Sequence, residues 1–147
     1  MEIRNCMITP VHTVGPADTI ATAARLMADF GIGAVPVIED GALRGIVTDR
    51  DIALRVVAQG LDADQPVTRF MSGDVKSCRP DACIDDVLAE MVTHGVRRIP
   101  VCSEGGALVG IVSIGDLARI DWDKEEIGIA LGDIGRRCST EIPAPGA

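Results

Sequence analysis

The feature that most constrains this chain is an internal repeat that covers most of its 147 residues. A shift of 64 residues matches these pairs: Met7/Met71, Val11/Val75, Pro16/Pro80, Ile20/Ile84, Met27/Met91, Gly31/Gly95 and Pro36-Val37/Pro100-Val101. One residue is inserted after Gly106, and the shift of 65 then carries Asp51 onto Asp116. A unit of roughly 60 residues is marginally stable alone. The repeat therefore predicts two halves that share a core.

Each copy of the repeat ends in the same short motif. The two copies read Gly45-Ile46-Val47-Thr48-Asp49-Arg50-Asp51 and Gly110-Ile111-Val112-Ser113-Ile114-Gly115-Asp116. The β-forming residues predict the end of a buried strand, and the hydroxyl residue stands where a helix N-cap would stand. Each copy therefore delivers one hydroxyl and one carboxylate to a corner between a strand and a helix.

Two interpretations of this corner remain open. A capping box needs only a hydroxyl residue with a carboxylate three positions later before an apolar run. In a nucleoside site, the carboxylate would instead accept hydrogen bonds from both hydroxyls of a ribose, while backbone N–H groups at the helix start attract a phosphate. The duplication of the motif favours the nucleoside site.

The order of elements is the same in both halves. Helical spacing of apolar residues predicts helices from Ile20 to Phe30 and from Ile84 to Met91, each ended by a glycine. Hairpins are predicted at Asp40-Gly41 and at 104–106. Short strands at 11–14 and 75–78 precede the helices, and further helices follow at 51–58 and 116–120. Each half thus reads β-α-β-β-α, which predicts an α+β (α/β) fold.

Two prolines lie inside predicted strands, Pro36 and Pro100. Proline cannot donate to a sheet, so each position indicates a strand edge or a bulge. We expect neighbouring backbone groups there to be unpaired and able to face a ligand.

The repeat divides the chain into three parts, 1–62, 63–121 and 122–147, with a polar linker at 59–66. The last part has no repeat partner. Residues 124–137 predict a helix with one apolar face formed by Ile127, Ala130, Leu131 and Ile134, although three glycines weaken it. From Cys138 on, the proline-rich end predicts a frayed tail.

These motifs, taken together, resemble a CBS domain, the domain named after cystathionine β-synthase. The resemblance rests on Ala34-Val35-Pro36-Val37, the acidic-glycine turn and the Gly45–Asp51 motif, and on their second copies in register. It covers roughly residues 5–120. Two such domains in tandem resemble a CBS pair, or Bateman module, of the small stand-alone bacterial kind. The resemblance implies two repeats packed pseudo-symmetrically.

The resemblance also implies an adenosine-containing ligand in clefts between the two halves. By position, Thr48 and Asp51 would hold one ribose, and Ser113 and Asp116 the other. Backbone groups of the strand stretches would border the bases, at Thr13-Val14, Val35-Pro36, Ser77-Cys78 and Ile99-Pro100. Arg97 and Arg98 are candidate phosphate contacts, although they could also be a solvated pair; the first half offers Arg50 instead, beside the repelling Asp49.

The composition and motifs of the chain limit the kinds of partner, location and activity that we expect. The net charge of −8 argues against non-specific binding to nucleic acid. There is no secretory signal and no apolar run long enough for a membrane span, so we expect a cytoplasmic protein. No arrangement of nucleophile and base indicates an enzyme, and no cofactor is expected.

The five cysteines have no zinc-like spacing, and buried reduced thiols are the default. A metal or redox site of Cys6, Cys78, Cys83 and His12 remains an alternative if their strands converge.

The sequence thus predicts a non-catalytic, energy-sensing regulatory module, a homodimer by the family resemblance, that binds AMP, ADP, ATP or a similar compound. A ligand-free interaction or stress-response module and a metal- or redox-responsive protein remain the alternatives.

Overall fold

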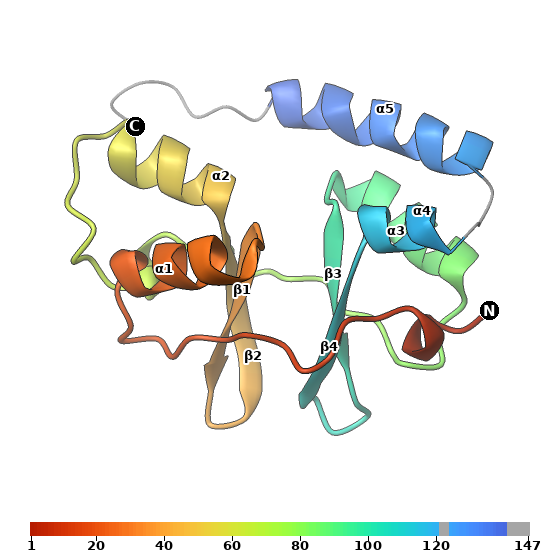
Figure 1. The fold of residues 1–147 in the computed structure, drawn as a ribbon, viewed down its shortest axis with the longest axis horizontal. Helices are drawn as coiled ribbons and strands as arrows, with labels where there is room; N and C mark the ends of the chain where they lie inside the picture. Colours follow the sequence, from red (N-terminus) through yellow and green to blue (C-terminus); the bar gives the residue numbers. More distant parts are fainter. Residues whose placement is uncertain (121–123, 141–147) are drawn as a thin grey trace. The chain divides into compact units, whose positions relative to one another are not determined.

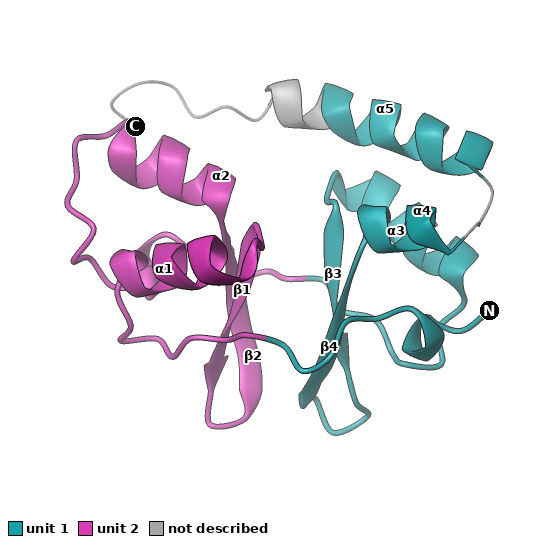
Figure 2. Cartoon of the chain, in the orientation of Figure 1, with its two compact units in different colours: residues 1–11, 76–142 teal, residues 12–75, 143–147 magenta. Residues whose placement is uncertain are grey.

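The computed structural model describes residues 1–120 and 124–140, which form two compact units. The first-repeat unit comprises His12–Val75. The second-repeat unit comprises Met1–Val11 together with the described residues from Lys76 on (Figure 2). Each unit has its own cluster of buried aliphatic side chains. No described helix is both long enough and apolar enough to cross a membrane.

The first-repeat unit is built on an antiparallel hairpin of β1 (Ala34–Glu39) and β2 (Ala42–Thr48), with helix α1 (Ile20–Phe30) packed beside it (Figure 1). Asp40 and Gly41 have φ values of 52° and 77°, as a two-residue hairpin turn requires. The chain then enters α2 (Asp49–Asp51), which continues as a π-helical segment, η2 (Ile52–Val57).

The second-repeat unit repeats this order. Helix α3 (Ile84–His94) precedes an antiparallel hairpin of β3 (Arg98–Cys102) and β4 (Leu108–Ser113), and α4 (Ile114–Arg119) follows. The predicted α+β fold with two repeats is therefore confirmed. The helices after the hairpins begin at Asp49 and Ile114, two residues before the predicted starts, because the hydroxyl residues cap them.

The strands predicted at 11–14 and 75–78 are wrong, because each contributes only one isolated bridge. Val14 bridges Val37 and Cys78 bridges Val101, both in parallel orientation. On the other edge, Ser72 bridges Ile46 of β2, and Ile8 bridges Ile111 of β4. Each hairpin is thus flanked on both sides by extended chain.

The segments on the outer edges are exchanged between the repeats. A 3₁₀ turn, η1 (Ile3–Asn5), and the chain up to Ile8 belong to the second-repeat unit, whereas the matching turn, η3 (Val67–Arg69), and Ser72 belong to the first-repeat unit. Sequence repeats and compact units are therefore different divisions of the chain.

A glycine makes room for each exchanged segment. A Cβ atom on Gly45 would lie 2.6 Å from the Met71 sulfur and 2.7 Å from the Ser72 carbonyl oxygen. On Gly110 it would lie 2.5 Å from the Met7 sulfur. The glycine that begins each motif is thus explained by close chain approach.

Helix α5 (Lys124–Thr140) packs on α3 and α4 (Figure 1). The predicted helix is confirmed, and Ile127, Ala130 and Ile134 are buried. The prediction for Leu131 is wrong, since it is 41% exposed on the flank of the helix. Backbone helix continues through Cys138, where the frayed tail was expected to begin; the rest of that tail, 141–147, lies outside the described residues.

Candidate functional site

Both corners are capping boxes with matching hydrogen bonds. In the first, the Asp51 backbone N–H donates to the Thr48 hydroxyl at 3.1 Å, and the Thr48 N–H donates to Asp51 Oδ2 at 2.9 Å. In the second, the Asp116 N–H donates to the Ser113 hydroxyl at 3.2 Å, and the Ser113 N–H donates to Asp116 Oδ2 at 2.8 Å. The capping interpretation is therefore confirmed for both copies.

The second oxygen of each carboxylate points away from the box. Asp51 Oδ1 lies 3.8 Å from Arg55 Nε, and Asp116 Oδ1 lies 3.5 Å from Arg119 Nη1. The two aspartate side chains are only 15% and 12% exposed. A carboxylate offers about four acceptor positions, so each Oδ1 can still accept a hydrogen bond from a ligand. Capping and nucleoside binding are chemically compatible at these corners.

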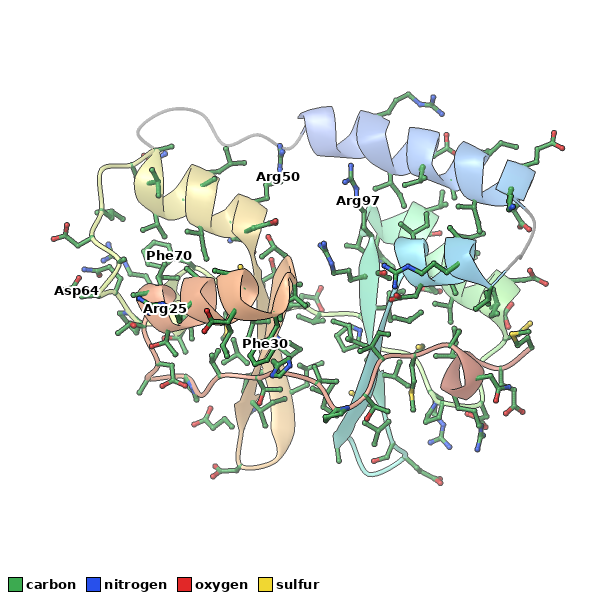
Figure 3. The ribbon with its side chains drawn as sticks, viewed as in Figure 1. Arg25, Phe30, Arg50, Asp64, Phe70 and Arg97 are labelled. Carbon is green, nitrogen blue, oxygen red and sulfur yellow. The ribbon has the colours of Figure 1, made fainter. Side chains whose placement is uncertain are left out.

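Two arginines lie beside the second corner. Arg98 begins β3 and pairs in register with Ser113, and the Arg97 carbonyl accepts from the Ile114 N–H at 2.9 Å. Arg97 is exposed and projects from the start of β3 (Figure 3). Neither guanidinium has a hydrogen-bonding or ionic partner among the described residues. The fold thus places two unpaired cations beside Ser113 and Asp116.

The first corner has a different lining. The counterparts of the two arginines are Gly33 and Ala34, and Asp49 Oδ1 accepts from the Arg50 N–H at 2.8 Å. A carboxylate therefore already accepts from a backbone donor in the first turn of α2. In the second copy, Ile114 and Gly115 stand at the positions of Asp49 and Arg50, so no carboxylate is present at the position that matches Asp49.

The strand residues predicted to border a ligand are mostly buried. Val35, Pro36, Ile99 and Pro100 are buried, whereas Thr13 and Ser77 are exposed. At each proline an edge or a bulge was predicted, and register shifts lie one residue further on, between Val37 and Ile38 and between Val101 and Cys102.

The expectation of unpaired backbone groups at the prolines is wrong in detail. The Val14 N–H donates to the Pro36 carbonyl at 3.1 Å, and the Cys78 N–H donates to the Pro100 carbonyl at 3.0 Å. Val14 and Cys78 thus occupy the strand edges next to the prolines, because a buried carbonyl needs a hydrogen-bond donor.

The predicted site residues thus fall into two sets, one in each unit. The first-repeat unit holds Thr13, Val35, Pro36, Thr48, Arg50 and Asp51, and the second-repeat unit holds Ser77, Arg97, Arg98, Ile99, Pro100, Ser113 and Asp116.

Sequence reasoning missed that the exchanged segments border the two aspartates. Burial and the nearby charge of Asp116 raise the pKa of the Cys6 thiol. The residue matching Cys6 is Phe70, whose carbonyl accepts from Arg55 Nη1 at 3.2 Å, and Arg55 is the ion-pair partner of Asp51. The repeat alignment, which pairs Cys6 with Phe70, was the signal that could have revealed this.

The family assignment follows from a direct match. The model of the CBS domain family matches residues 2–58 and 67–123, which together contain both corners. The chain belongs to the CBS-domain family. This tandem CBS protein is 44% identical over 133 residues to the CBS domain-containing protein YhcV of Bacillus subtilis, covering 90% of this chain and 94% of YhcV.

Two solved structures show what similar CBS pairs hold. The crystal structure of Hypoxic Response Protein I, which contains two coordinated zinc ions, is 37% identical, with a TM-score of 0.74 over 81% of this chain and 98% of that one. The CBS domain pair of protein MJ0100, in complex with 5-methylthioadenosine and S-adenosyl-L-methionine, is 26% identical, with a TM-score of 0.76 over 82% and 94% of the two chains.

The four cysteines whose side chains the structure describes, Cys6, Cys78, Cys83 and Cys102, all belong to the second-repeat unit. Burial, assisted by the charges of Cys102 and Cys6, raises the pKa of Cys78 to about 11. In contrast, His12 lies in the first-repeat unit, where its ring stacks on Phe30 at a centroid distance of 3.7 Å. Across the described parts of the chain, no three His, Cys, Asp or Glu side chains are grouped as a metal site would need.

Proposed function

We propose that this CBS protein is a non-catalytic regulatory module that binds an adenosine-containing ligand such as AMP, ADP or ATP at its two corners. The observation that carries the proposal is the pair of largely buried carboxylates, each held by a capping box through Oδ2 while its Oδ1 lies outside the box. The adenosyl compounds in the similar pair of MJ0100 support this ligand class.

To bind a ribose, the protein mainly has to orient the two aspartate carboxylates. The capping box orients each carboxylate, so Asp51 or Asp116 can accept from the two ribose hydroxyls without a further loss of side-chain freedom. Low exposure keeps competing water away from these charge-assisted hydrogen bonds, which strengthens them. Binding by these contacts needs no nucleophile, in keeping with a sensor.

The two corners are proposed to differ in ligand preference. Arg97 and Arg98 favour a phosphorylated ligand at the second corner. At the first corner, the negative charge of Asp49 opposes a phosphate, so a ligand without one would bind there preferentially.

We also infer that the protein is a homodimer in the cytoplasm. Aliphatic side chains left on helical surfaces, such as Val57, which is 69% exposed, support the dimer. Sedimentation at micromolar concentration should show a dimer. A clean monomer would remove the dimer but leave the ligand proposal intact.

Calorimetric titration of the full chain with AMP, ADP, ATP and S-adenosylmethionine tests the function. Asp51→Ala and Asp116→Ala should each weaken binding at their own corner about tenfold or more, since a charge-assisted hydrogen bond is worth roughly 1.5–3 kcal/mol. Thr19→Ala is the matched control, because Thr19 caps α1 by accepting from the Thr22 N–H but lies outside the motif. It should cost about 1 kcal/mol of stability and no affinity.

Loss of stability without loss of affinity in both aspartate variants would leave only the capping role. Absence of binding by all four compounds would favour the ligand-free interaction module.

A further inference from the structure

The first corner contains an arginine for which the proposed ligand contacts do not account. Arg55 lies in η2, four residues after Asp51, and its Nε is 3.8 Å from Asp51 Oδ1. Its Nη1 donates to the Phe70 carbonyl at 3.2 Å. One guanidinium therefore joins the carboxylate of the corner to the chain that follows η3. In the second repeat, Ile120 stands at the position of Arg55, so the second corner has no arginine there.

The pair of Arg55 and Asp51 is held apart. Oppositely charged side chains four residues apart on a helix attract each other, and a guanidinium–carboxylate hydrogen bond measures about 2.7–2.9 Å. At 3.8 Å the contact is an ion pair without a hydrogen bond, and Asp51 Oδ1 accepts no hydrogen bond from the part of the chain that the structure describes. The bond from Nη1 to the Phe70 carbonyl accounts for this distance, because it fixes the direction of a rigid, planar group.

The acceptor at the other end of the guanidinium is firmly placed. Phe70 is 5% exposed and belongs to the core of the first-repeat unit. Two residues later, Ser72 exchanges two backbone hydrogen bonds with Ile46 of β2, at 2.9 and 3.1 Å. The η3 segment, which we define as residues 67–72, is thus docked on the hairpin and holds Arg55 through Phe70. Beyond this segment the chain enters the second-repeat unit.

We propose that the η3 segment controls access to the first corner through Arg55. While the segment is docked, Phe70 holds the guanidinium away from Asp51 Oδ1, and a ribose can donate to that oxygen. When the segment is released, Arg55 closes on Asp51 as a bidentate pair and takes the acceptor positions that the ribose needs. The docked state is the state that binds, so an occupied corner keeps the segment docked. The inference rests on the proposed ribose contact at Asp51 and adds the regulation of that site.

Coupling of this kind is reciprocal. A ligand that binds the docked state lowers the population of the released state by the same factor by which release weakens binding. The Ser72 amide reports the released state, because its bond to the Ile46 carbonyl protects it from exchange only while the segment is docked. The matched amide in the second repeat is that of Ile8, which donates to the Ile111 carbonyl at 2.8 Å.

Hydrogen exchange of the full chain, followed by NMR, tests the coupling. Asp116→Ala is the background, so that adenosine binds at the first corner only. Saturating adenosine should slow exchange of the Ser72 amide about tenfold or more and that of Ile8 less than about twofold. Arg55→Gln should abolish the effect of adenosine on Ser72 and leave adenosine affinity within about threefold, because Asp51 Oδ1 is then open in both states. General stabilisation by the ligand would instead protect Ser72 equally in Arg55→Gln.

A double variant tests the closing step. Ser72→Pro removes the N–H that donates to Ile46 and releases the segment, so adenosine affinity should fall about tenfold. Adding Arg55→Gln should restore the affinity to within about threefold of the background, because no arginine is left to close on the carboxylate. Ile8→Pro, which removes the matched bond in the second repeat, is the control and should leave adenosine affinity unchanged. If Ser72→Pro does not fold, the exchange experiment, which keeps the segment intact, decides alone.

Three results would overturn the inference. Bound adenosine that leaves Ser72 exchange unchanged, or slows it equally in Arg55→Gln, would show that Arg55 does not couple the corner to the segment. Failure of Arg55→Gln to restore affinity in folded Ser72→Pro would show that the arginine does not close. In these cases adenosine binding that Asp51→Ala weakens would leave the proposed function standing. Absence of saturable adenosine binding would overturn the ribose contact at Asp51 and this inference with it.

Discussion

The two strand-to-helix corners have the same local geometry and different surroundings. Both hold a capping box with hydrogen bonds that differ by about 0.1 Å between copies, at 2.9 and 2.8 Å and at 3.1 and 3.2 Å. Around them, Gly33, Ala34 and Asp49 in the first repeat become Arg97, Arg98 and Ile114 in the second. The comparison teaches that the cap serves the fold in both repeats, while the neighbouring positions differ in charge, which is the basis of the proposed difference in ligand preference.

The largest expected difference between the repeats concerns the clearance glycines. Gly45→Ala should cost about 3 kcal/mol of unfolding free energy, because the new methyl group meets the rigid Ser72 carbonyl as well as Met71. Gly110→Ala should cost about 1 kcal/mol, since the three atoms nearest to the new methyl group all belong to the Met7 side chain, whose sulfur end can move. Urea denaturation of both variants checks this, and equal losses would contradict it.

An alkaline loss of stability should arise from the second-repeat unit. The unfolded chain releases the Cys78 proton near pH 9, but the folded chain holds it to about pH 11. The stabilisation is therefore complete below pH 9 and is lost as pH rises through 11; because solvent screens the partly exposed thiol, we expect the loss to be about 1 kcal/mol. The matching residue in the first repeat is Val14, which cannot titrate.

Denaturation midpoints between pH 8 and pH 11 measure this effect. Cys78→Val should flatten the decline, and Cys83→Ala, which keeps Cys78, should retain it. A decline of the same size in Cys78→Val would assign it to another group.

The arginine pair should distinguish phosphorylated from unphosphorylated ligands. Replacing both Arg97 and Arg98 by Gln should weaken AMP at the second corner about tenfold, because two charge-assisted contacts to phosphate are removed. Adenosine should bind as before. Calorimetry with both ligands checks this, with Arg44→Gln, an exposed arginine paired with Glu39, as the control. Equal losses for AMP and adenosine would mean that the arginines do not face a phosphate.

A small gain in AMP affinity is expected at the first corner. Asp49→Asn removes the opposing charge at the first corner and should raise its AMP affinity two- to threefold, in line with the roughly 0.2–1 kcal/mol of an exposed charge interaction. Adenosine affinity should not change. A gain for adenosine of the same size would point to a shape effect instead of charge.

Metal content provides a further comparison with a relative. Hypoxic Response Protein I holds two zinc ions in its structure, whereas the described residues here offer no metal-binding group. Elemental analysis of purified protein should find less than stoichiometric zinc. One zinc per chain would move the metal-responsive alternative to first place.

Elements governed by near neighbours were predictable from the sequence. The hairpin turn at Asp40-Gly41 and the two capping boxes depend on residues within four positions, so composition and spacing were enough to identify them. The helix of α1 followed from one apolar face and a terminal glycine, and its C-cap residue Gly31 has the left-handed conformation expected there.

Contacts between distant segments were decided by the tertiary structure. The sequence by itself determined a helix, a hairpin and a capped helix in each of two repeats, and the residues beside each capped corner. Only the tertiary structure showed that the Val14 N–H donates to the Pro36 carbonyl and that residues 1–11 pack with the second repeat. It also showed that α5 packs on α3 and that a groove lies between these two helices. These contacts depend on which buried strand edge still needs a hydrogen-bond donor and on where a glycine leaves room for another segment of the chain. Neither condition can be read from residues that are close in sequence.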